Sequence, residues 1–357
     1  MEKRLLSLVL TLALCLGQAL PVLAAEDAAG TPETGYTDVP ADCWCAESIA
    51  RATELGLFQG LGDGRFGRGE PITRSAFITA LVRLFGWSAE IPPKGTFSDV
   101  APGSWYYAAV ETAYANDAVA ASDHAFRPGD NISRGEMVTM LIRGLGYTAL
   151  AGTVSTYSSP FTDVSANKGF ISIAYDMALV DGVGDGRFDP DGSATREQAA
   201  VLLVRVYDLL HAPPAAMQSA GGYTRVAVPT PKPAAGGEIP TTPLEPLTEL
   251  YSALRQLKSS GTDMGQVVLC LSAGGVRTLV EKNTIVSTEV LTASQVEEVL
   301  SSAEDLSTYY SDRYECAYCL YRTEDGQEAT LWYQNERSLA AKLQLASLFG
   351  VTRYVLE

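Results

Sequence analysis

Histidine is nearly absent from this chain, which has only His124 and His211 among its 357 residues. Hydrolases that use a Ser-His-Asp or Cys-His arrangement need a histidine as the base. His124 occupies a turn position that glycine fills in two similar segments, and His211 follows a predicted helix at the edge of a proline-rich stretch. A catalytic triad is therefore hard to build from this sequence.

Cysteine is also scarce. Of six cysteines, one lies in the apolar N-terminal segment. The five that remain are an odd, sparse set, which does not predict a disulfide framework. Two short spacings could each supply half a zinc site, but no further histidine or cysteine stands at ligand spacing. We expect ordinary half-buried thiols, no metal and no cofactor; the residues are Cys43, Cys45, Cys270, Cys316 and Cys319.

Basic residues are few, with 26 Lys and Arg against 42 Asp and Glu, a net charge of −16. Affinity for nucleic acid comes largely from neutralisation of phosphates by Lys and Arg. Nucleic acid is therefore a poor candidate partner. An anionic partner must be held by a local basic site that works against the overall negative field.

A long apolar run occurs only at the N-terminus. Lys3-Arg4 precedes an apolar segment from Leu5 to Leu20, and small residues follow at 24–25. This pattern predicts a signal peptide over 1–25 and an exported protein. A membrane anchor is the alternative, but the run is somewhat short of the ~20 residues that a span needs. We therefore expect no membrane contact after cleavage.

A triplicated pattern is the strongest feature that is present. An aromatic-x-Asp-Val box begins at Tyr36, Phe97 and Phe161, and the box recurs after 61 and then 64 residues. A period of this size indicates a repeated structural module. Each box is followed by an Asp, a Phe three residues later and a hydroxyl-Arg pair after that: Asp63-Phe66-Thr73-Arg74, Asp123-Phe126-Ser133-Arg134 and Asp185-Phe188-Thr195-Arg196.

Apolar spacing predicts a helix, a loop and a second helix in each copy, over residues 36–90, 97–150 and 161–211. The third copy lacks a Trp, and 22 residues separate Asp163 from Asp185, against 25 and 24 in the other copies. We predict that its first helix is about one turn shorter and that Phe170 or Ile171 supplies part of the packing.

The hydroxyl-Arg pairs suggest both a cap and a binding site. Thr73, Ser133 and Thr195 are placed to cap the second helix of each copy, and Glu136 and Gln198 complete two capping boxes. A cation in the first helical turn opposes the helix dipole, yet Arg stands there in all three copies. An Arg beside exposed helix N–H groups suits an anion, above all a carboxylate. The alternative is that each Arg pairs with the Asp of its own repeat.

Trp44 and Trp105 leave two possibilities open, since their flat rings could stack on a sugar or pack in the core. The cluster Asp181, Asp185, Asp189 and Asp191 invites a calcium interpretation. Pro190 stands where a calcium loop of the EF-hand type needs glycine, so we interpret the cluster as turn residues.

The boxes and the hydroxyl-Arg pairs resemble the S-layer homology (SLH) domain. The resemblance implies a pseudo-trimer of helical repeats that binds secondary cell-wall polysaccharide, typically through a pyruvylated terminal sugar. The first copy lacks the Glu of the family's Thr-Arg-Ala-Glu motif and the third lacks the Trp, so we expect the second groove to be the most complete. The candidate polysaccharide-binding residues are Arg74, Arg134, Arg196, Thr73, Ser133, Thr195, Glu136, Trp44, Trp105, Asp38, Asp99 and Asp163.

Residues 212–243 hold seven of the eighteen prolines and are predicted to be a stiff linker. Residues 244–357 are predicted to be a separate α/β unit. Its elements are helices at 244–260, from Thr292 and at 338–349, strands at 267–271 and 351–356, and a hairpin of 314–322 with 329–333. The acidic pairs Glu297-Glu298 and Glu304-Asp305 are interpreted as lying on a solvated helix.

The last part of this unit resembles the end of bacterial family 18 glycosidase barrels. The family's Asp-x-x-Asp-x-Asp-x-Glu motif is absent from the sequence, so the resemblance carries no catalytic acid and we predict no enzymatic activity. The fold class expected is an all-α SLH pseudo-trimer, a Pro-rich linker and a small α/β domain. The function expected is non-covalent anchoring at the cell wall or S-layer surface. The alternative is a wall-attached glycoside hydrolase that acts through 244–357.

Overall fold

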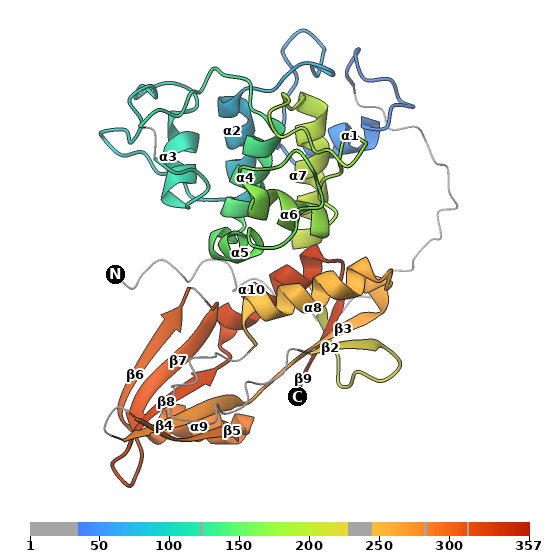
Figure 1. Cartoon of the computed structure of the whole chain (residues 1–357). Helices are drawn as coiled ribbons and strands as arrows, with labels where there is room; N and C mark the ends of the chain where they lie inside the picture. Colours follow the sequence, from blue (N-terminus) through green and yellow to red (C-terminus); the bar gives the residue numbers. More distant parts are fainter. Residues whose placement is uncertain (1–34, 122–123, 228–244, 282–283, 313) are drawn as a thin grey trace, which may run out of the picture.

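The computed structural model describes residues 35–121, 124–227, 245–281, 284–312 and 314–357. The predicted signal peptide lies outside these residues. Helical repeats form one part of the molecule and an α/β unit the other (Figure 1). No helix in the described ranges combines the length and the apolar character needed to cross a membrane.

The repeats are helix-loop-helix units, as predicted. Because apolar residues recur on one side of each helix, residues such as Phe77 and Leu81 are fully buried where the helices pack together. The first and second helices are α1 (Ala46–Glu54) with α2 (Arg74–Phe85), α3 (Tyr107–Ala115) with α4 (Arg134–Gly144), and α6 (Lys168–Asp176) with α7 (Arg196–Leu210). A further helix, α5 (Thr148–Val154), separates the second and third repeats.

The prediction for the third repeat was wrong in one respect. Its first helix, α6, has nine residues, as α1 and α3 have. The missing residues come from the preceding loop, since α6 begins four residues after Val164 whereas α1 begins seven after Val39. Ile171 is buried, as predicted. The loop shortens because the helix must stay long enough to cover the same core.

The three second helices begin at one end of the bundle, where short backbone bridges connect the repeats in a ring. Thr73 pairs with Asn131, Ser133 with Ser193, and Pro71 with Thr195. Each repeat is therefore joined to both others immediately before α2, α4 or α7. This arrangement is the pseudo-threefold architecture that the resemblance to the S-layer homology domain implies.

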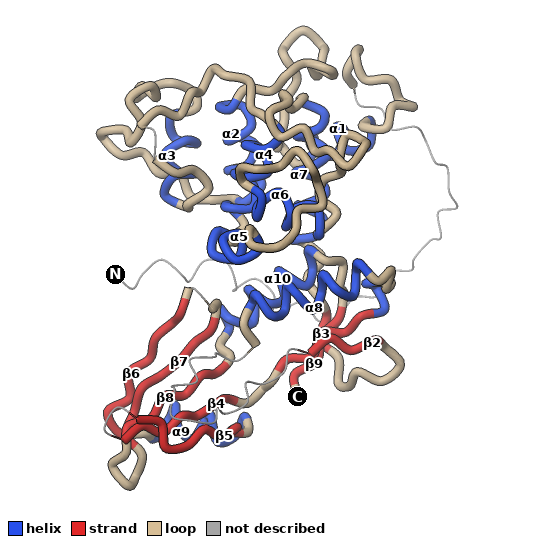
Figure 2. The backbone as a smooth tube through the Cα atoms, in the orientation of Figure 1, coloured by secondary structure: helices blue, strands red, loops and turns tan. Residues whose placement is uncertain are grey.

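The α/β unit contains a four-stranded parallel sheet in the order β1-β9-β3-β2 (Figure 2). Its strands are β1 (Ala215–Ala216), β2 (Thr224–Ala227), β3 (Val267–Leu271) and β9 (Arg353–Leu356). The predicted linker 212–243 therefore differs from the structure at its start, because β1 and β2 belong to this sheet. The remainder of that segment, 228–243, lies outside the described residues.

A second sheet is antiparallel, in the order β5-β4-β8-β7-β6. Its strands are β4 (Gly275–Glu281), β5 (Thr284–Leu291), β6 (Glu304–Ser311), β7 (Cys316–Arg322) and β8 (Glu328–Tyr333), and helix α9 (Ala293–Ser302) packs on one face. The predicted hairpin is β7–β8. Strands β4, β5 and β6 were not predicted, and Glu304-Asp305 open β6 rather than lie on a helix.

Two helices connect the α/β unit to the repeats. Helices α8 (Leu247–Ser259) and α10 (Glu336–Leu348) lie between the parts in Figure 1. Tyr251 of α8 is fully buried and donates its hydroxyl to Asp176 of α6, which also pairs with Arg255 at 2.9 Å. Gln344 of α10 donates to the carbonyl of Leu145 at 3.1 Å. The α/β unit, which the sequence predicts to be separate, packs directly on the repeats, because one hydrophobic core includes residues of both parts.

Glu245, which lies just before α8, is a buried carboxylate. It accepts hydrogen bonds from the Ser272 N–H at 2.6 Å and from the Gln334 amide at 2.9 Å, and the same amide's oxygen accepts from Lys342 at 2.8 Å. Burial raises the pKa of Glu245 to about 7 and lowers the pKa of the fully buried Lys342.

We expect Glu245 to make stability fall as pH rises. The folded state holds the proton of the Glu245 carboxyl group more tightly than the unfolded chain does. The stabilisation from this proton is therefore full below pH ~4.3 and is lost as pH rises to about 7. The expected loss is about 2–3 kcal/mol of unfolding free energy. Glu245→Gln should not show this loss, because glutamine does not titrate. Urea unfolding at pH 5 and pH 8 measures it, with the exposed Glu249→Gln as control. Equal pH dependence in all three proteins would contradict the assignment.

Candidate functional site

The aspartates of the three boxes hold the turns that precede the second helices. The Asp38 carboxylate accepts from the N–H groups of Phe66, Gly67 and Arg68 at 2.7–2.8 Å. Although burial alone would raise it, these donors hold the pKa of Asp38 below its usual value. Asp99 accepts in the same way from the N–H groups of Phe126 and Arg127, and Asp163 accepts from those of Phe188 and Asp189. The three side chains therefore shape the turns.

The hydroxyl residues cap the second helices, as predicted. Thr73 accepts from the Ala76 N–H, and Ser133 with Glu136 and Thr195 with Gln198 form complete capping boxes. The first helical N–H groups, however, are not open to an anion. Those of Arg74, Arg134 and Arg196 donate to carbonyls of another repeat at 2.8–3.0 Å. The expectation of exposed N–H groups at these positions was therefore wrong.

Each arginine links its repeat to the next one around the ring. The Nε atoms of Arg74, Arg134 and Arg196 donate to the carbonyls of Phe126, Phe188 and Phe66 at 2.7, 3.0 and 2.8 Å. Each guanidinium also lies over the ring of that phenylalanine, at 4.6–5.1 Å from its centre. Closure of the ring explains why Arg recurs three times. In the described residues, these arginines form no ion pair with an Asp of their own repeats.

The three arginines differ in whether their guanidinium groups can still donate a hydrogen bond to a ligand. Arg74 is 7% exposed and its Nη1 lies 2.8 Å from Glu136, which also pairs with Arg127. Arg134 and Arg196 are half-buried, and their Nη2 atoms donate to the carbonyls of Asp181 and Gln59. Among the described residues, no acceptor is found for Nη1 of either. Arg134 and Arg196 can therefore bind a further acceptor, whereas Arg74 is neutralised within the protein.

The two tryptophans lie at the surface. Trp44 is 65% exposed and Trp105 is 66% exposed, each in the loop before the first helix of its repeat. Of the two possibilities that the sequence left open, core packing is therefore wrong. The exposed rings have faces available for stacking on a sugar.

Among the described residues, one junction between repeats has both an exposed tryptophan in the receiving repeat and an arginine that is not ion-paired. We define the 3/1 junction as Arg196, the turn 66–70 on which it lies, and Trp44. Arg68 of this turn lies beside Cys45, the neighbour of Trp44. At the next junction Trp105 is accompanied by the neutralised Arg74, and at the last one Arg134 has no tryptophan in the receiving repeat. The 3/1 junction is not the second groove, which the sequence predicts to be the most complete.

Gly67 is required at the 3/1 junction. Its φ of +90° favours glycine, and an added Cβ would lie 3.0 Å from the Arg196 side chain. Arg68 was not among the residues predicted from sequence. The signal that could have found it is the pair of basic residues, Arg65 and Arg68, which flank Phe66 in the first copy alone.

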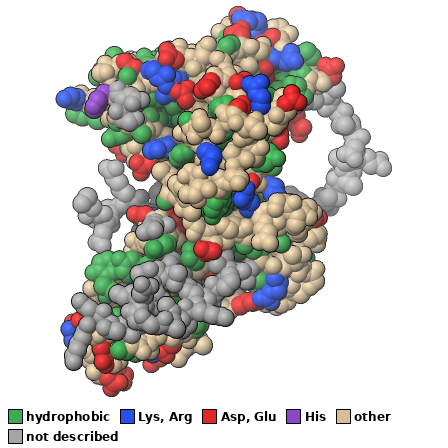
Figure 3. Space-filling view, viewed as in Figure 1, with side chains coloured by type: hydrophobic (Ala, Val, Ile, Leu, Met, Phe, Trp, Pro, Cys, Tyr) green, Lys and Arg blue, Asp and Glu red, His purple; other side chains and the backbone are tan. Residues whose placement is uncertain are grey.

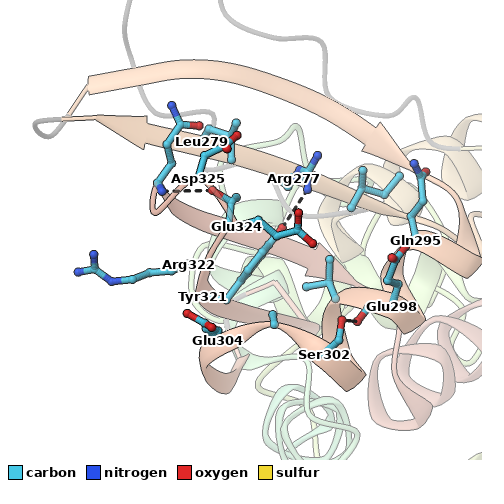
Figure 4. Close-up of a pocket in the computed structure, with 15 residues that line it drawn as sticks. Arg277, Leu279, Gln295, Glu298, Ser302, Glu304, Tyr321, Arg322, Glu324 and Asp325 are labelled. Carbon is cyan, nitrogen blue, oxygen red and sulfur yellow. Dashed lines mark hydrogen bonds between the residues drawn. The ribbon is translucent and has the colours of Figure 1, made fainter.

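The cavities among the described residues include two larger ones that lie away from the 3/1 junction. One of about 590 Å³ lies between α9 and the five-stranded sheet, where Arg277 hydrogen-bonds Tyr321 (Figure 4). Arg277 also donates to Glu289. Another of 770 Å³ is lined by α5, the start of α6 and Arg143. Neither contains a predicted site residue. On the face in Figure 3, acidic and basic side chains are interspersed over the repeats.

A ring of three linked helix-loop-helix repeats with exposed aromatic loops defines a triplicated helical module. The profile described as the S-layer homology domain matches residues 35–78, 96–138 and 160–200. The chain contains three S-layer homology domains.

Relatives include surface proteins and enzymes. The chain is 34% identical to the middle cell wall protein of Brevibacillus brevis over 41% of its own length and 14% of that protein. It is 26% identical to the S-layer protein sap of Bacillus anthracis over 62% and 26%, and 27% identical to an amylopullulanase of Thermoanaerobacterium thermosulfurigenes over 47% and 9%. The chain thus spans about a quarter or less of each relative. The expected cell-surface location is confirmed, and the repeats support cell-wall anchoring.

Solved structures show partial likeness to this chain. The spore cortex-lytic enzyme SleL of Bacillus megaterium QM B1551 matches 33% of this chain and 27% of that chain, with 15% identity and a TM-score of 0.28. The C-terminal domain of a putative chitinase from Desulfitobacterium hafniense DCB-2 matches 44% and 45%, with 19% identity and the same TM-score. Scores this low support no conclusion about activity.

Proposed function

We propose that the protein attaches non-covalently to an acidic, pyruvylated secondary cell-wall polysaccharide, and that the 3/1 junction is its main contact. The observation that carries the proposal is the combination of a 65% exposed Trp44 with Arg196, whose Nη1 has no acceptor among the described residues. A pyruvate ketal presents a carboxylate next to a sugar ring. The guanidinium suits the carboxylate and the indole suits the ring.

The position of the junction fits an anchor. The arginines lie where α2, α4 and α7 begin, whereas the far ends of α4 and α7 contact α10 through Gln344 and Ser347. Helices of this length place the two ends roughly 15–20 Å apart. The α/β unit therefore leaves the arginine end of the ring uncovered. We propose that this unit is not catalytic, since the acidic motif of family 18 glycosidases is absent from the sequence.

We expect Trp44→Ala to weaken binding to purified cell-wall sacculi by about threefold to tenfold, because one stacking surface is lost. Co-sedimentation of the full chain measures the affinity. Trp105→Ala is the matched control, since Trp105 is equally exposed but accompanies the neutralised Arg74. Arg196→Lys, which keeps the charge but loses the planar fork, should weaken binding further.

Mild acid, which removes pyruvate ketals, should abolish the difference between Trp44→Ala and the unaltered protein. Equal losses for Trp44→Ala and Trp105→Ala would contradict the assignment to the 3/1 junction. Binding that survives both Arg196→Lys and ketal removal would refute carboxylate recognition. Release of soluble sugars from the same sacculi would favour the alternative, a wall-attached hydrolase.

A further inference from the structure

Two thiols flank the tryptophan of the 3/1 junction and contact each other. The Sγ atoms of Cys43 and Cys45 are 2.7 Å apart. The hydrogen bond from the Ala46 N–H to the Cys43 carbonyl, at 3.0 Å, closes a turn that brings the alternate side chains 43 and 45 to the same side. Both are free thiols.

The two thiols differ in accessibility. Cys43 is half-buried, whereas Cys45 is fully buried and immediately precedes α1. Burial, together with the neighbouring Cys43, raises the pKa of the Cys45 thiol to about 11. An incoming reagent therefore meets Cys43 first, and Cys45 stands behind it as a protonated partner.

The other described cysteines lack this arrangement. Cys316 and Cys319 lie on β7 with their side chains in hydrophobic clusters on opposite faces of the sheet, and Cys270 is buried in the parallel sheet. They serve as internal controls for any chemistry at the Cys43–Cys45 pair.

We propose that Cys43 and Cys45 are a reversible disulfide site, oxidised by thiol–disulfide exchange with a small-molecule disulfide. The Cys43 thiolate attacks one sulfur of the disulfide, which forms a mixed disulfide and releases one thiolate. Cys45 then gives its proton to the first released thiolate, and the Cys45 thiolate attacks the Cys43 sulfur of the mixed disulfide. This releases the second thiolate of the reagent, which takes up the proton that Cys43 gave to the solvent. The two protein thiols lose two electrons and two protons in total, and the reagent becomes two thiols.

Oxidation changes the surroundings of Trp44, because this residue is the single link between the two bonded cysteines. Contraction from 2.7 Å to the ~2.05 Å of a disulfide also fixes one dihedral angle about the new bond. Arg68, which lies beside Cys45, loses a thiol neighbour at the same time. The bond thus acts on two side chains of the 3/1 junction. This consequence for binding rests on the proposed function, whereas the disulfide itself does not.

The test treats the reduced, full-length chain with excess glutathione disulfide, followed by alkylation and peptide mass mapping. We expect a peptide with Cys43 and Cys45 that has lost two hydrogens and resists alkylation, while Cys319 stays alkylatable after unfolding. Cys45→Ser should stop at the Cys43–glutathione mixed disulfide, and Cys319→Ser should behave as the unaltered chain. Two alkylatable thiols at 43 and 45, or a mixed disulfide that persists in the unaltered chain, would overturn the proposal.

Fluorescence and binding report the consequence separately. Oxidation should change the tryptophan emission of the chain, and Trp44→Phe should remove that change. Oxidation should also alter sacculus affinity by about threefold to tenfold, reversibly with dithiothreitol. A disulfide that forms without altered emission would overturn its effect on Trp44. Altered emission in a chain that never binds sacculi would overturn the proposed function and leave the disulfide site standing.

Discussion

Tyr251→Ala is expected to lower the free energy of unfolding of the whole protein by about 3–5 kcal/mol, the cost of removing a buried aromatic side chain. Tyr251 is fully buried, stacks edge-on against Phe349 and donates its hydroxyl to Asp176 of the third repeat. Loss of the ring leaves a cavity where the α/β unit meets the repeats. Urea unfolding measures the change.

Two comparisons divide the effect into parts. Tyr251→Phe keeps the ring and removes one hydrogen bond to a carboxylate, which should cost about 1–3 kcal/mol. Val290→Ala, at a 63% exposed position, should cost less than about 0.5 kcal/mol. Circular dichroism and tryptophan fluorescence should report one coincident transition in the unaltered protein. Two separate transitions, with Tyr251→Ala affecting only one, would show that the two parts fold independently.

Arg74→Gln is expected to destabilise the protein by about 3 kcal/mol, because it breaks a largely buried ion pair and leaves the Phe126 carbonyl without its donor. Burial lowers the pKa of Arg74. Burial alone would raise the pKa of Glu136, but the Ser133 N–H and then Arg74 and Arg127 hold it below its usual value. Arg127 still neutralises Glu136 in the variant, which limits the loss. Urea unfolding gives the magnitude.

Arg74 should nevertheless be dispensable for sacculus binding. At a temperature where Arg74→Gln is folded, its affinity should equal that of the unaltered chain, whereas Arg196→Lys should bind weakly and lose less stability. Arg143→Gln, at the opposite end of the bundle, is a control for charge, since Arg143 donates to the Asp117 carbonyl. If Arg74→Gln abolishes binding while folded, the distinction between the two arginines is wrong.

Local signals explain what was predictable. Thr73, Ser133 and Thr195 cap the second helices through contacts only three residues away, so sequence spacing alone identifies them. The helices at α8, α9 and α10 and the β7–β8 hairpin follow from periodicity in the same way. Strands β4, β5 and β6 escaped prediction. For example, the strand β6 carries exposed polar side chains along most of its length, which the sequence presents as a solvated helix.

The sequence by itself determined the triplication, the caps and the three arginines at the helix starts. Only the tertiary structure decided what those arginines contact, because their carbonyl partners stand 52, 54 and 130 residues away. The same holds for the exposure of Trp44 and Trp105, for the neutralisation of Arg74 by Glu136, and for the packing of α8 and α10 on the repeats. Burial and charge pairing depend on the neighbours that folding brings together, and those neighbours are distant in the chain.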